Sequence, residues 1–146
     1  MATPPLIFVL NGPNLNLLGS REPEIYGSDT LDDIAGRLLQ RAEELGVALD
    51  MRQSNHEGHL IDWLHEAQAS GAKAAIINPG GYSHTSVALH DAVKAISTPV
   101  VEVHLSDPES RESFRHTDLV ALAATKVIKG QGADGYLVAL DVAASL

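Results

Sequence analysis

The sequence predicts a parallel α/β fold, and three observations carry that prediction. Short apolar runs of strand length alternate five times with stretches of helical, amphipathic spacing. This alternation is typical of β-α units, which form one parallel sheet with helices on both faces. The length of 146 residues fits one domain, so residues 1–146 are predicted to be a single domain.

The first half of the chain gives two strands and one helix. Residues 6–10 are a continuous apolar run, as expected for a strand buried on both faces. A loop rich in Gly, Pro and Asn follows over about 11–29, and loops of this length are usually functional. A capping box at Thr30-Leu31-Asp32-Asp33 opens a helix whose expected C-cap is Gly46. Residues 47–51 alternate as in a strand.

The second half repeats this pattern. A second capping box, Ser54-Asn55-His56-Glu57, is predicted to open a helix that stops near Gly71. A third helix is predicted to open at His84. The remaining predicted elements are strands at 74–77, 100–104 and 126–129, one short helix within 106–118, and a last helix over about 132–144. Five strands in a chain of this size suit the flavodoxin-like order 2-1-3-4-5.

The composition excludes several classes of protein. Ten Lys and Arg against 19 Asp and Glu give a net charge of −9, which argues against nucleic-acid and anionic membrane partners. No apolar run reaches the roughly 18 residues that span a bilayer. The segment before Arg21 lacks the basic start of a signal peptide. Because the chain has no Cys, disulfides and thiol catalysis are excluded, and a cytoplasmic enzyme or binding domain is expected.

Unusual polar residues follow the predicted strands, at the edge where such folds bind ligands. After the first strand come Asn11, Asn14, Arg21 and Tyr26; after the third come Asn78, Gly80, Gly81 and His84; the fourth ends in Glu102 and His104, with Ser106, Arg111 and Arg115 beyond it. Three distant loops are therefore predicted to meet in one cleft. Taken alone, the Asn-rich turns are also compatible with turn chemistry, and Tyr26 with a loop anchor.

The end of the fourth strand carries an acid–base pair. Glu102 and His104 are two residues apart and share a strand face, so the carboxylate can orient the imidazole for general acid or base catalysis. A satisfied core histidine is the alternative that His104 alone would favour. Arg111 and Arg115 share a face if their segment is helical, and with Arg21 they predict an anion-binding spot. The alternative for these two arginines is a solvated surface pair.

Other motifs carry no function. The run Gly130-Gln131-Gly132-Ala133-Asp134-Gly135 matches GxGxxG, but too little chain follows for the returning strand and the acidic ribose ligand. His56, His59 and His65 offer metal nitrogens without a matching carboxylate cluster. These motifs therefore predict neither a dinucleotide site nor a metal site.

Two binding classes share the predicted fold. A receiver domain should carry an Asp phosphoacceptor at the end of the third strand. This chain has Asn78 there, which argues against a receiver domain. An FMN-binding flavodoxin should have Ser/Thr-rich phosphate turns and aromatic residues beside the flavin. The first loop has little hydroxyl, and the chain has one Trp.

Several motifs in order resemble one enzyme family. They are Asn11-Gly12-Pro13-Asn14-Leu15, Arg21-Glu22-Pro23 with Tyr26-Gly27, Gln53-Ser54-Asn55-His56-Glu57, Asn78-Pro79-Gly80 with His84-Thr85-Ser86, Glu102-Val103-His104, Arg111, Phe114-Arg115 and Gly135-Tyr136. Together they resemble the type II 3-dehydroquinate dehydratases, or dehydroquinases, over essentially the whole chain. The resemblance implies a flavodoxin-like fold and conversion of 3-dehydroquinate to 3-dehydroshikimate and water by trans elimination, without metal or cofactor. It also implies a role in aromatic amino-acid biosynthesis by the shikimate pathway, or in quinate breakdown.

The resemblance also implies roles for residues. Tyr26 resembles the base that takes a C2 proton, Arg21 the cation that favours its tyrosinate, and His104 the acid for the C1 hydroxyl. Asn14 would hold the water or enolate oxygen, and Arg111 would belong to the lid. The implied substrate-binding positions are Asn78, His84, Asp91, Leu105, Ser106 and Arg115.

The family is typically a dodecamer of trimers, so a homo-oligomer is expected. Asp91 lies about 10 Å along a helix from His84, at 1.5 Å per residue, and would reach a neighbour's cleft. A solvated helix aspartate is the alternative. The chain departs from the family pattern at His59, His90 and Thr117-Asp118, none of which is a catalytic position in that pattern.

Overall fold

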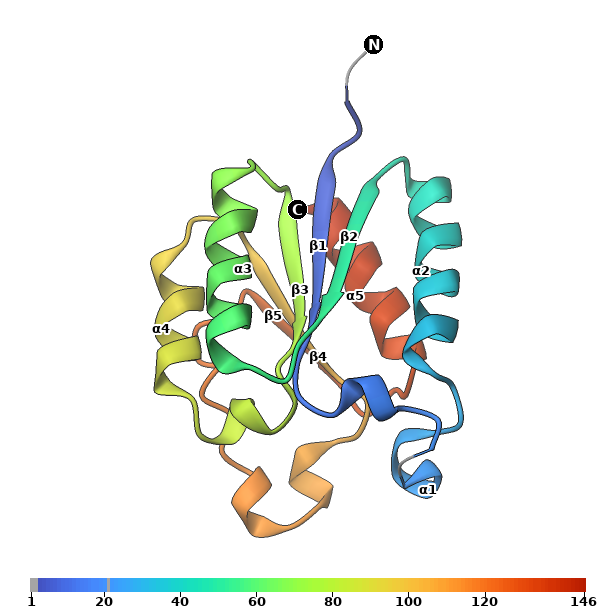
Figure 1. Ribbon diagram of the computed structural model, residues 1–146, viewed down its shortest axis with the longest axis vertical. Coiled ribbons are helices and arrows are strands. Elements are labelled where there is room, and N and C mark those ends of the chain that lie inside the picture. Colours follow the sequence, from blue (N-terminus) through green and yellow to red (C-terminus); the bar gives the residue numbers. More distant parts are fainter. Residues whose placement is uncertain (1–2, 21) are drawn as a thin grey trace.

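Five parallel strands form the sheet of this protein. The computed structural model describes residues 3–20 and 22–146, apart from the side chain of Tyr26. The strand order is β2-β1-β3-β4-β5, which confirms the predicted order (Figure 1). The strands are β1 (Leu6–Asn11), β2 (Ala48–Gln53), β3 (Ala74–Asn78), β4 (Val100–His104) and β5 (Lys126–Lys129).

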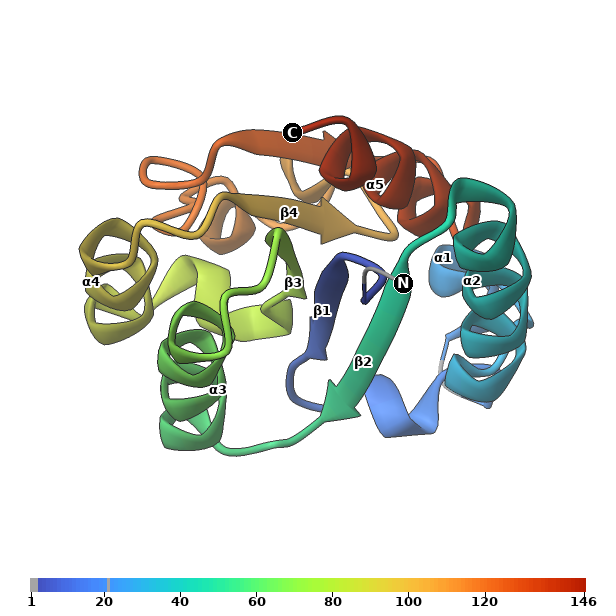
Figure 2. The same cartoon turned by 90° about the horizontal axis from the view of Figure 1, so that it is seen from above.

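Helices cover both faces of the sheet, as Figure 2 shows. On one face lie α2 (Leu31–Leu45) and α5 (Asp134–Ser145), which pack on Ile7, Val9 and Ile76. On the other face lie α3 (Glu57–Ala69) and α4 (Val87–Ala95), which pack on Phe8, Leu10 and Ile77. Alternate residues of each strand therefore pack into two separate cores, because successive side chains of a strand point to opposite faces of the sheet. None of the helices in the described residues combines the length and apolar character of a membrane span.

Local sequence signals define the ends of α2. The Thr30 side chain accepts from the Asp33 N–H, and the Asp33 carboxylate accepts from the Thr30 N–H, both at 3.0 Å. This is the predicted capping box. Gly46 closes the helix with φ +71°, a left-handed conformation that suits glycine.

Two predicted helix starts are wrong. Helix α3 begins at Glu57 without a side-chain cap, because Ser54 Oγ instead accepts from the His56 N–H and contacts His59 Nδ1 at 2.7 Å. Helix α4 begins at Val87 rather than His84, because Ser86 Oγ accepts from the Leu89 N–H at 2.9 Å and so caps it. His84 instead ends a separate 3-10 helix, η2 (Gly80–His84).

The two long loops hold more structure than predicted. The loop after β1 contains η1 (Leu15–Leu17) and α1 (Pro23–Tyr26). The segment after β4 contains two 3-10 turns, η3 (Pro108–Ser110) and η4 (Ser113–Arg115), in place of one short helix. Arg111 separates these turns in extended backbone, with φ −112° and ψ −160°. The expected shared helix face of Arg111 and Arg115 is therefore wrong.

Gly12 lets the loops after β1 and β3 touch. Its N–H donates to the Asn78 carbonyl at 2.8 Å, and a Cβ at this position would lie 2.7 Å from the Pro79 carbonyl oxygen. Backbone cannot yield as a flexible side chain can. The close contact therefore requires glycine.

We expect Gly12→Ala to lower the free energy of unfolding by about 1–3 kcal/mol, because the added methyl overpacks two backbone segments. The matched control is Gly36→Ala, at an exposed position of α2, where nothing lies within 4 Å of an added Cβ. That change should stabilise the protein by about 0.5–1 kcal/mol. Urea denaturation of both variants measures the difference. Equal stability of Gly12→Ala and the wild type would show that the contact is not tight.

Candidate active site

The loops after β1, β3 and β4 gather at the carboxyl edge of the sheet (Figure 1). A cleft lies among them. Its volume is about 500 Å³, which suits a small organic molecule. The cleft is lined by Pro13, Asn14, Leu15, Asn78, Gly80, Gly81, His84, Thr85, His104, Leu105, Ser106, Pro108, Arg111, Phe114 and Arg115. The predicted convergence of three distant loops is thus present in the structure.

Asn14 lines the cleft from the loop after β1. Its φ of 69° is left-handed, a region that Asn tolerates better than most residues. Its N–H donates to Asn55 Oδ1 at 3.0 Å, which ties the loop after β1 to the loop after β2. The backbone that presents Asn14 is therefore fixed by a residue distant in sequence.

A series of buried hydrogen bonds lies beneath the cleft. Asn78 Nδ2 donates to the Tyr136 hydroxyl at 3.0 Å, and that hydroxyl donates to Asn11 Oδ1 at 2.7 Å. Asn78 Oδ1 accepts from the Gly80 N–H at 3.2 Å. Burial raises the pKa of Tyr136 far above its ordinary value, although the bond with Asn78 opposes this, so the phenol remains a donor. These bonds fix the Asn78 amide beneath the cleft.

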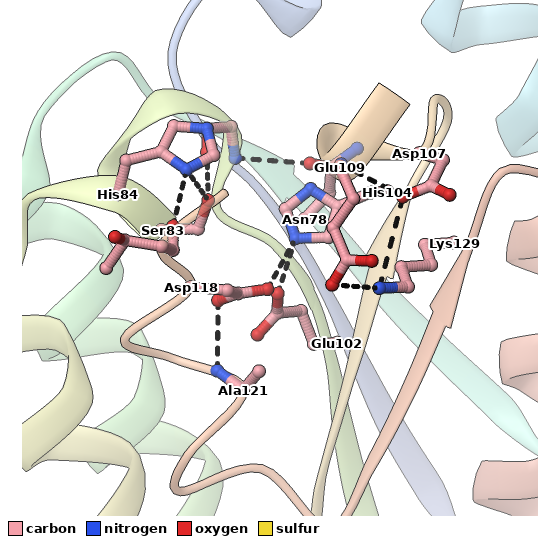
Figure 3. A network of polar contacts seen from close by, with 12 residues as sticks. Asn78, Ser83, His84, Glu102, His104, Asp107, Glu109, Asp118, Ala121 and Lys129 are labelled. Carbon is pink, nitrogen blue, oxygen red and sulfur yellow. Dashed lines mark hydrogen bonds and ion pairs between the residues drawn. The ribbon is translucent and has the colours of Figure 1, made fainter. Parts of the chain in front are cut away.

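His84 enters the cleft from η2 with one ring nitrogen already assigned. Its Nδ1 lies 2.8 Å from the Thr117 carbonyl oxygen (Figure 3). A carbonyl oxygen only accepts, so Nδ1 carries the hydrogen of this bond. The other nitrogen, Nε2, remains for a ligand.

Glu102 and His104 meet on one face of β4. Glu102 is fully buried and His104 is 7% exposed. His104 Nε2 hydrogen-bonds Glu102 Oε2 and lies 3.4 Å from Asp118 Oδ2 (Figure 3). Because the carboxyl groups of Glu102 and Asp118 both face Nε2, Nδ1 is the ring nitrogen left to exchange a proton with a ligand.

Asp118 is a neighbour of His104 that the sequence did not predict. The family pattern implies no catalytic position at Thr117-Asp118, whereas in the structure the Asp118 carboxylate lies 3.4 Å from His104 Nε2. The segment reaches His104 because it leads into β5, which pairs with β4. The only sequence signal is topological: the connection between neighbouring strands passes the end of the first.

The pKa values of Glu102, His104 and Asp118 are shifted in different directions. Burial raises the pKa of Glu102 to about 8, against the opposing bond with His104. Burial alone would lower the pKa of His104, but the bonds with Asp118 and Glu102 raise it to about 9. Burial would raise the pKa of Asp118, yet His104 and Glu102 hold it at about 2. These shifts favour an imidazolium at His104, an ionised Asp118 and a protonated Glu102 at neutral pH.

Glu102, His104 and Asp118 are the one cluster of three side chains, among residues 3–20 and 22–146, whose residue types could hold a metal ion. Their potential ligand atoms lie within 4.8 Å of one another. An ion bound by both His104 Nε2 and Glu102 Oε2 would hold those atoms about 3 Å apart or more. The two atoms instead hydrogen-bond each other directly. The geometry favours proton sharing over metal binding.

Two arginines place positive charge over the cleft. Arg111 Nη1 lies 3.4 Å from Ser106 Oγ, and Arg111 Nη2 lies 4.0 Å from Glu22 Oε2. The Arg115 guanidinium pairs with Glu112 and lies 4.8 Å from the centre of the Phe114 ring. Both arginine side chains are mostly buried and both line the cleft, where they offer positive charge to an anion in an acidic chain.

The remaining predicted site residues lie elsewhere. Asp91 is exposed on α4 and is not one of the described residues that line the cleft. Arg21 and the side chain of Tyr26 lie outside the described residues. Sequence reasoning did not anticipate Thr85 and Pro108 in the lining, since neither carries a charge or a catalytic group.

The sheet order and the cleft define a flavodoxin-like α/β protein with a buried histidine–carboxyl pair at the edge of a small cleft. The comparisons are more specific: a family model described as "Dehydroquinase class II" matches residues 5–144. The chain belongs to the class II dehydroquinase family.

Similar proteins cover nearly its whole length. A 3-dehydroquinate dehydratase of Caulobacter vibrioides is 59% identical over 140 residues, covering 96% of this chain and 95% of that protein. Crystal structures of type II dehydroquinases from Butyrivibrio crossotus and Propionibacterium acnes superpose with TM-scores of 0.94 each. They are 38% and 40% identical, and cover 97% and 100% of this chain and 99% and 100% of their own.

Proposed function

We propose that this protein removes water from 3-dehydroquinate to give 3-dehydroshikimate, the step of the shikimate pathway that also serves quinate breakdown. The observation that carries the proposal is His104, held by Glu102 and Asp118 at the edge of a cleft that two arginines make receptive to a carboxylate. A base takes a C2 proton, and the electron pair forms an enolate with the C3 ketone. When the enolate collapses, the C1–O bond breaks and His104 Nδ1 protonates the departing hydroxyl as water.

Tyr26 is the proposed base, and Arg21 its activating cation. A tyrosine with a pKa near 10 is a poor base at neutral pH; lowering that pKa by about 3 units corresponds to about 4 kcal/mol. A nearby guanidinium in a site of low dielectric constant supplies much of this. Arg21 is five residues from Tyr26 in the same loop.

The other cleft residues bind and orient the substrate. Asn14 holds the enolate oxygen or a water, and Asn78 and His84 bind hydroxyl groups. Leu105 and Ser106 bind the carboxylate through backbone N–H groups. In support, the Leu105 carbonyl accepts from the Gly132 N–H at 2.9 Å, which fixes the peptide that carries the Ser106 N–H, and the Ser106 carbonyl accepts from the Gly130 N–H at 3.2 Å. Arg115 adds charge, and Arg111 belongs to the lid.

An ultraviolet assay for the conjugated enone tests this function. Purified enzyme and 3-dehydroquinate should produce the absorbance in the presence of EDTA, and activity should survive borohydride added with substrate. A Schiff-base enzyme would be inactivated by borohydride. None of the four lysines (Lys73, Lys94, Lys126 and Lys129) is among the described residues of the cleft lining. Absence of the enone, or inactivation by either reagent, would contradict the proposal.

We further infer that residues 1–146 form one catalytic domain that assembles as a dodecamer of trimers. Asp91 would then complete a neighbouring cleft. Val87 and Asp91 are one helical turn apart on α4 and both are exposed, Val87 to 61%. An exposed apolar side chain beside a carboxylate suits a contact between subunits.

For Asp91→Ala we expect a smaller assembly and a higher KM, with each subunit still folded. Asp62→Ala is the matched control, since Asp62 is an exposed aspartate on α3. Light scattering and the enone assay are run on the same samples. A fully active monomer, or unchanged mass and kinetics in Asp91→Ala, would remove the shared site.

A further inference from the structure

The segment that carries Asp118 is fastened on both sides of the residue. His84 Nδ1 donates to the Thr117 carbonyl at 2.8 Å, and the Leu119 N–H donates to the Ser83 carbonyl at 2.7 Å. His90 Nδ1 lies 2.6 Å from the Leu119 carbonyl oxygen, which can only accept. Two positions that depart from the family pattern, His90 and Asp118, therefore lie in one connected structure.

The Asp118 carboxylate is also oriented. Its Oδ1 accepts from the Ala121 N–H at 3.0 Å, and its Oδ2 lies 3.4 Å from His104 Nε2 (Figure 3). The local backbone bond fixes one oxygen and aims the other at the imidazole. Asp118 is 20% exposed at the side chain, so it keeps partial contact with water.

Glu102 has a different environment. It is fully buried, and its Oε1 has no hydrogen-bond partner among the described atoms. Its carboxyl group and that of Asp118 have oxygens within 4.8 Å of each other. Two carboxylates this close in a desolvated site do not both ionise readily, and the more buried one keeps the proton.

We propose that Asp118 is a positioning residue of the acid step: its carboxylate is the counter-ion that keeps His104 protonated, while Glu102 is a neutral hydrogen-bond partner. The inference rests on the proposed function only in naming the step that uses the proton. His104 Nδ1 gives its proton to the departing hydroxyl, the ring becomes neutral, and solvent returns the proton. Asp118 and Glu102 keep the same protonation throughout.

Other charged groups face His104, and they act in the opposite sense. Arg111 and Arg115 line the same cleft, and His84 enters it from η2. Lys129 is the register partner of His104 on β5, although its Nζ lies 3.3 Å from Glu109 Oε1 and 3.9 Å from Asp107 Oδ1 (Figure 3). The guanidinium and ammonium charges among these groups disfavour an imidazolium, and the Asp118 carboxylate that faces the ring stabilises it.

NMR titration of the His104 ring, in the assembled protein labelled at histidine nitrogen, tests the counter-ion directly. In Asp118→Asn the titration midpoint should fall by about one pH unit or more, whereas Glu102→Gln should move it less. Asp107→Asn is the matched control, because Asp107 also caps a turn, by accepting from the Glu109 N–H at 3.0 Å. It should leave the midpoint unchanged. Asp118→Ser is the second variant, since serine can still accept from the Ala121 N–H.

The enone assay adds a kinetic readout. With a midpoint one unit lower, kcat of Asp118→Asn at pH 9 should fall about fivefold and kcat at pH 6 should stay within about twofold, with KM little changed. The proposal is overturned if the His104 midpoint is unchanged in both Asp118 variants, or if it falls further in Glu102→Gln. The NMR result stands even if the protein forms no enone, so the two proposals fail separately.

Discussion

Tyr26→Phe should lower kcat by at least about 10³-fold, because the change removes the proposed base and its hold on the C2 proton together. The phenyl ring retains the bulk of tyrosine, so KM should change little. Tyr82→Phe is the matched control: the Tyr82 hydroxyl donates to the Asn55 carbonyl at 2.7 Å, outside the proposed chemistry. Turnover of Tyr26→Phe near that of the wild type would remove Tyr26 from the base role.

The companion change is Arg21→Ala. Without the proposed activating cation the tyrosinate should form only at higher pH, so the reaction should slow and its acidic limb should move toward alkaline pH. A slower reaction with an unmoved pH profile would mean that Arg21 stabilises the transition state without activating Tyr26.

His104→Ala is expected to lower kcat by about 10²–10⁴-fold, since the departing hydroxyl loses its acid. Glu102→Gln should cost less, because the amide can still hold the ring by a hydrogen bond and Asp118 still faces Nε2. The enone assay at saturating substrate measures both. A larger loss in Glu102→Gln than in His104→Ala would show that the two roles are assigned wrongly.

The sheet could be predicted because its signals are local in sequence. Strand β4 and strand β5 have the predicted bounds, since apolar residues recur there without a competing pattern. The Thr30 capping box likewise depends on two residues three positions apart. The predicted starts of α3 and α4 are wrong because a serine can bond to any of several nearby backbone groups, and spacing alone does not decide which. Ser54 accepts from the His56 N–H, and Ser86 accepts from the Leu89 N–H.

The cleft could be predicted from topology. Asn14, Asn78, His84 and His104 were assigned to one site because they follow strands that end at the same edge. The contact of Asp118 with His104 could not be predicted, since it depends on how a loop fourteen residues further on folds back over β4. The separation of Arg111 from Arg115 depends on an extended residue between two short turns, for which the sequence carries no periodic signal.

The stereochemical course of the elimination tests the central claim most directly. The proposed base comes from the loop after β1 and the proposed acid from the end of β4, so we expect hydrogen and hydroxyl to leave from opposite faces of the substrate. The measurement uses 3-dehydroquinate with deuterium at either C2 position, follows the enone by absorbance, and finds the label by mass spectrometry. We expect the enone to form and to lose only the deuterium opposite the C1 hydroxyl. No enone, or loss of the deuterium on the same face as that hydroxyl, would contradict the account.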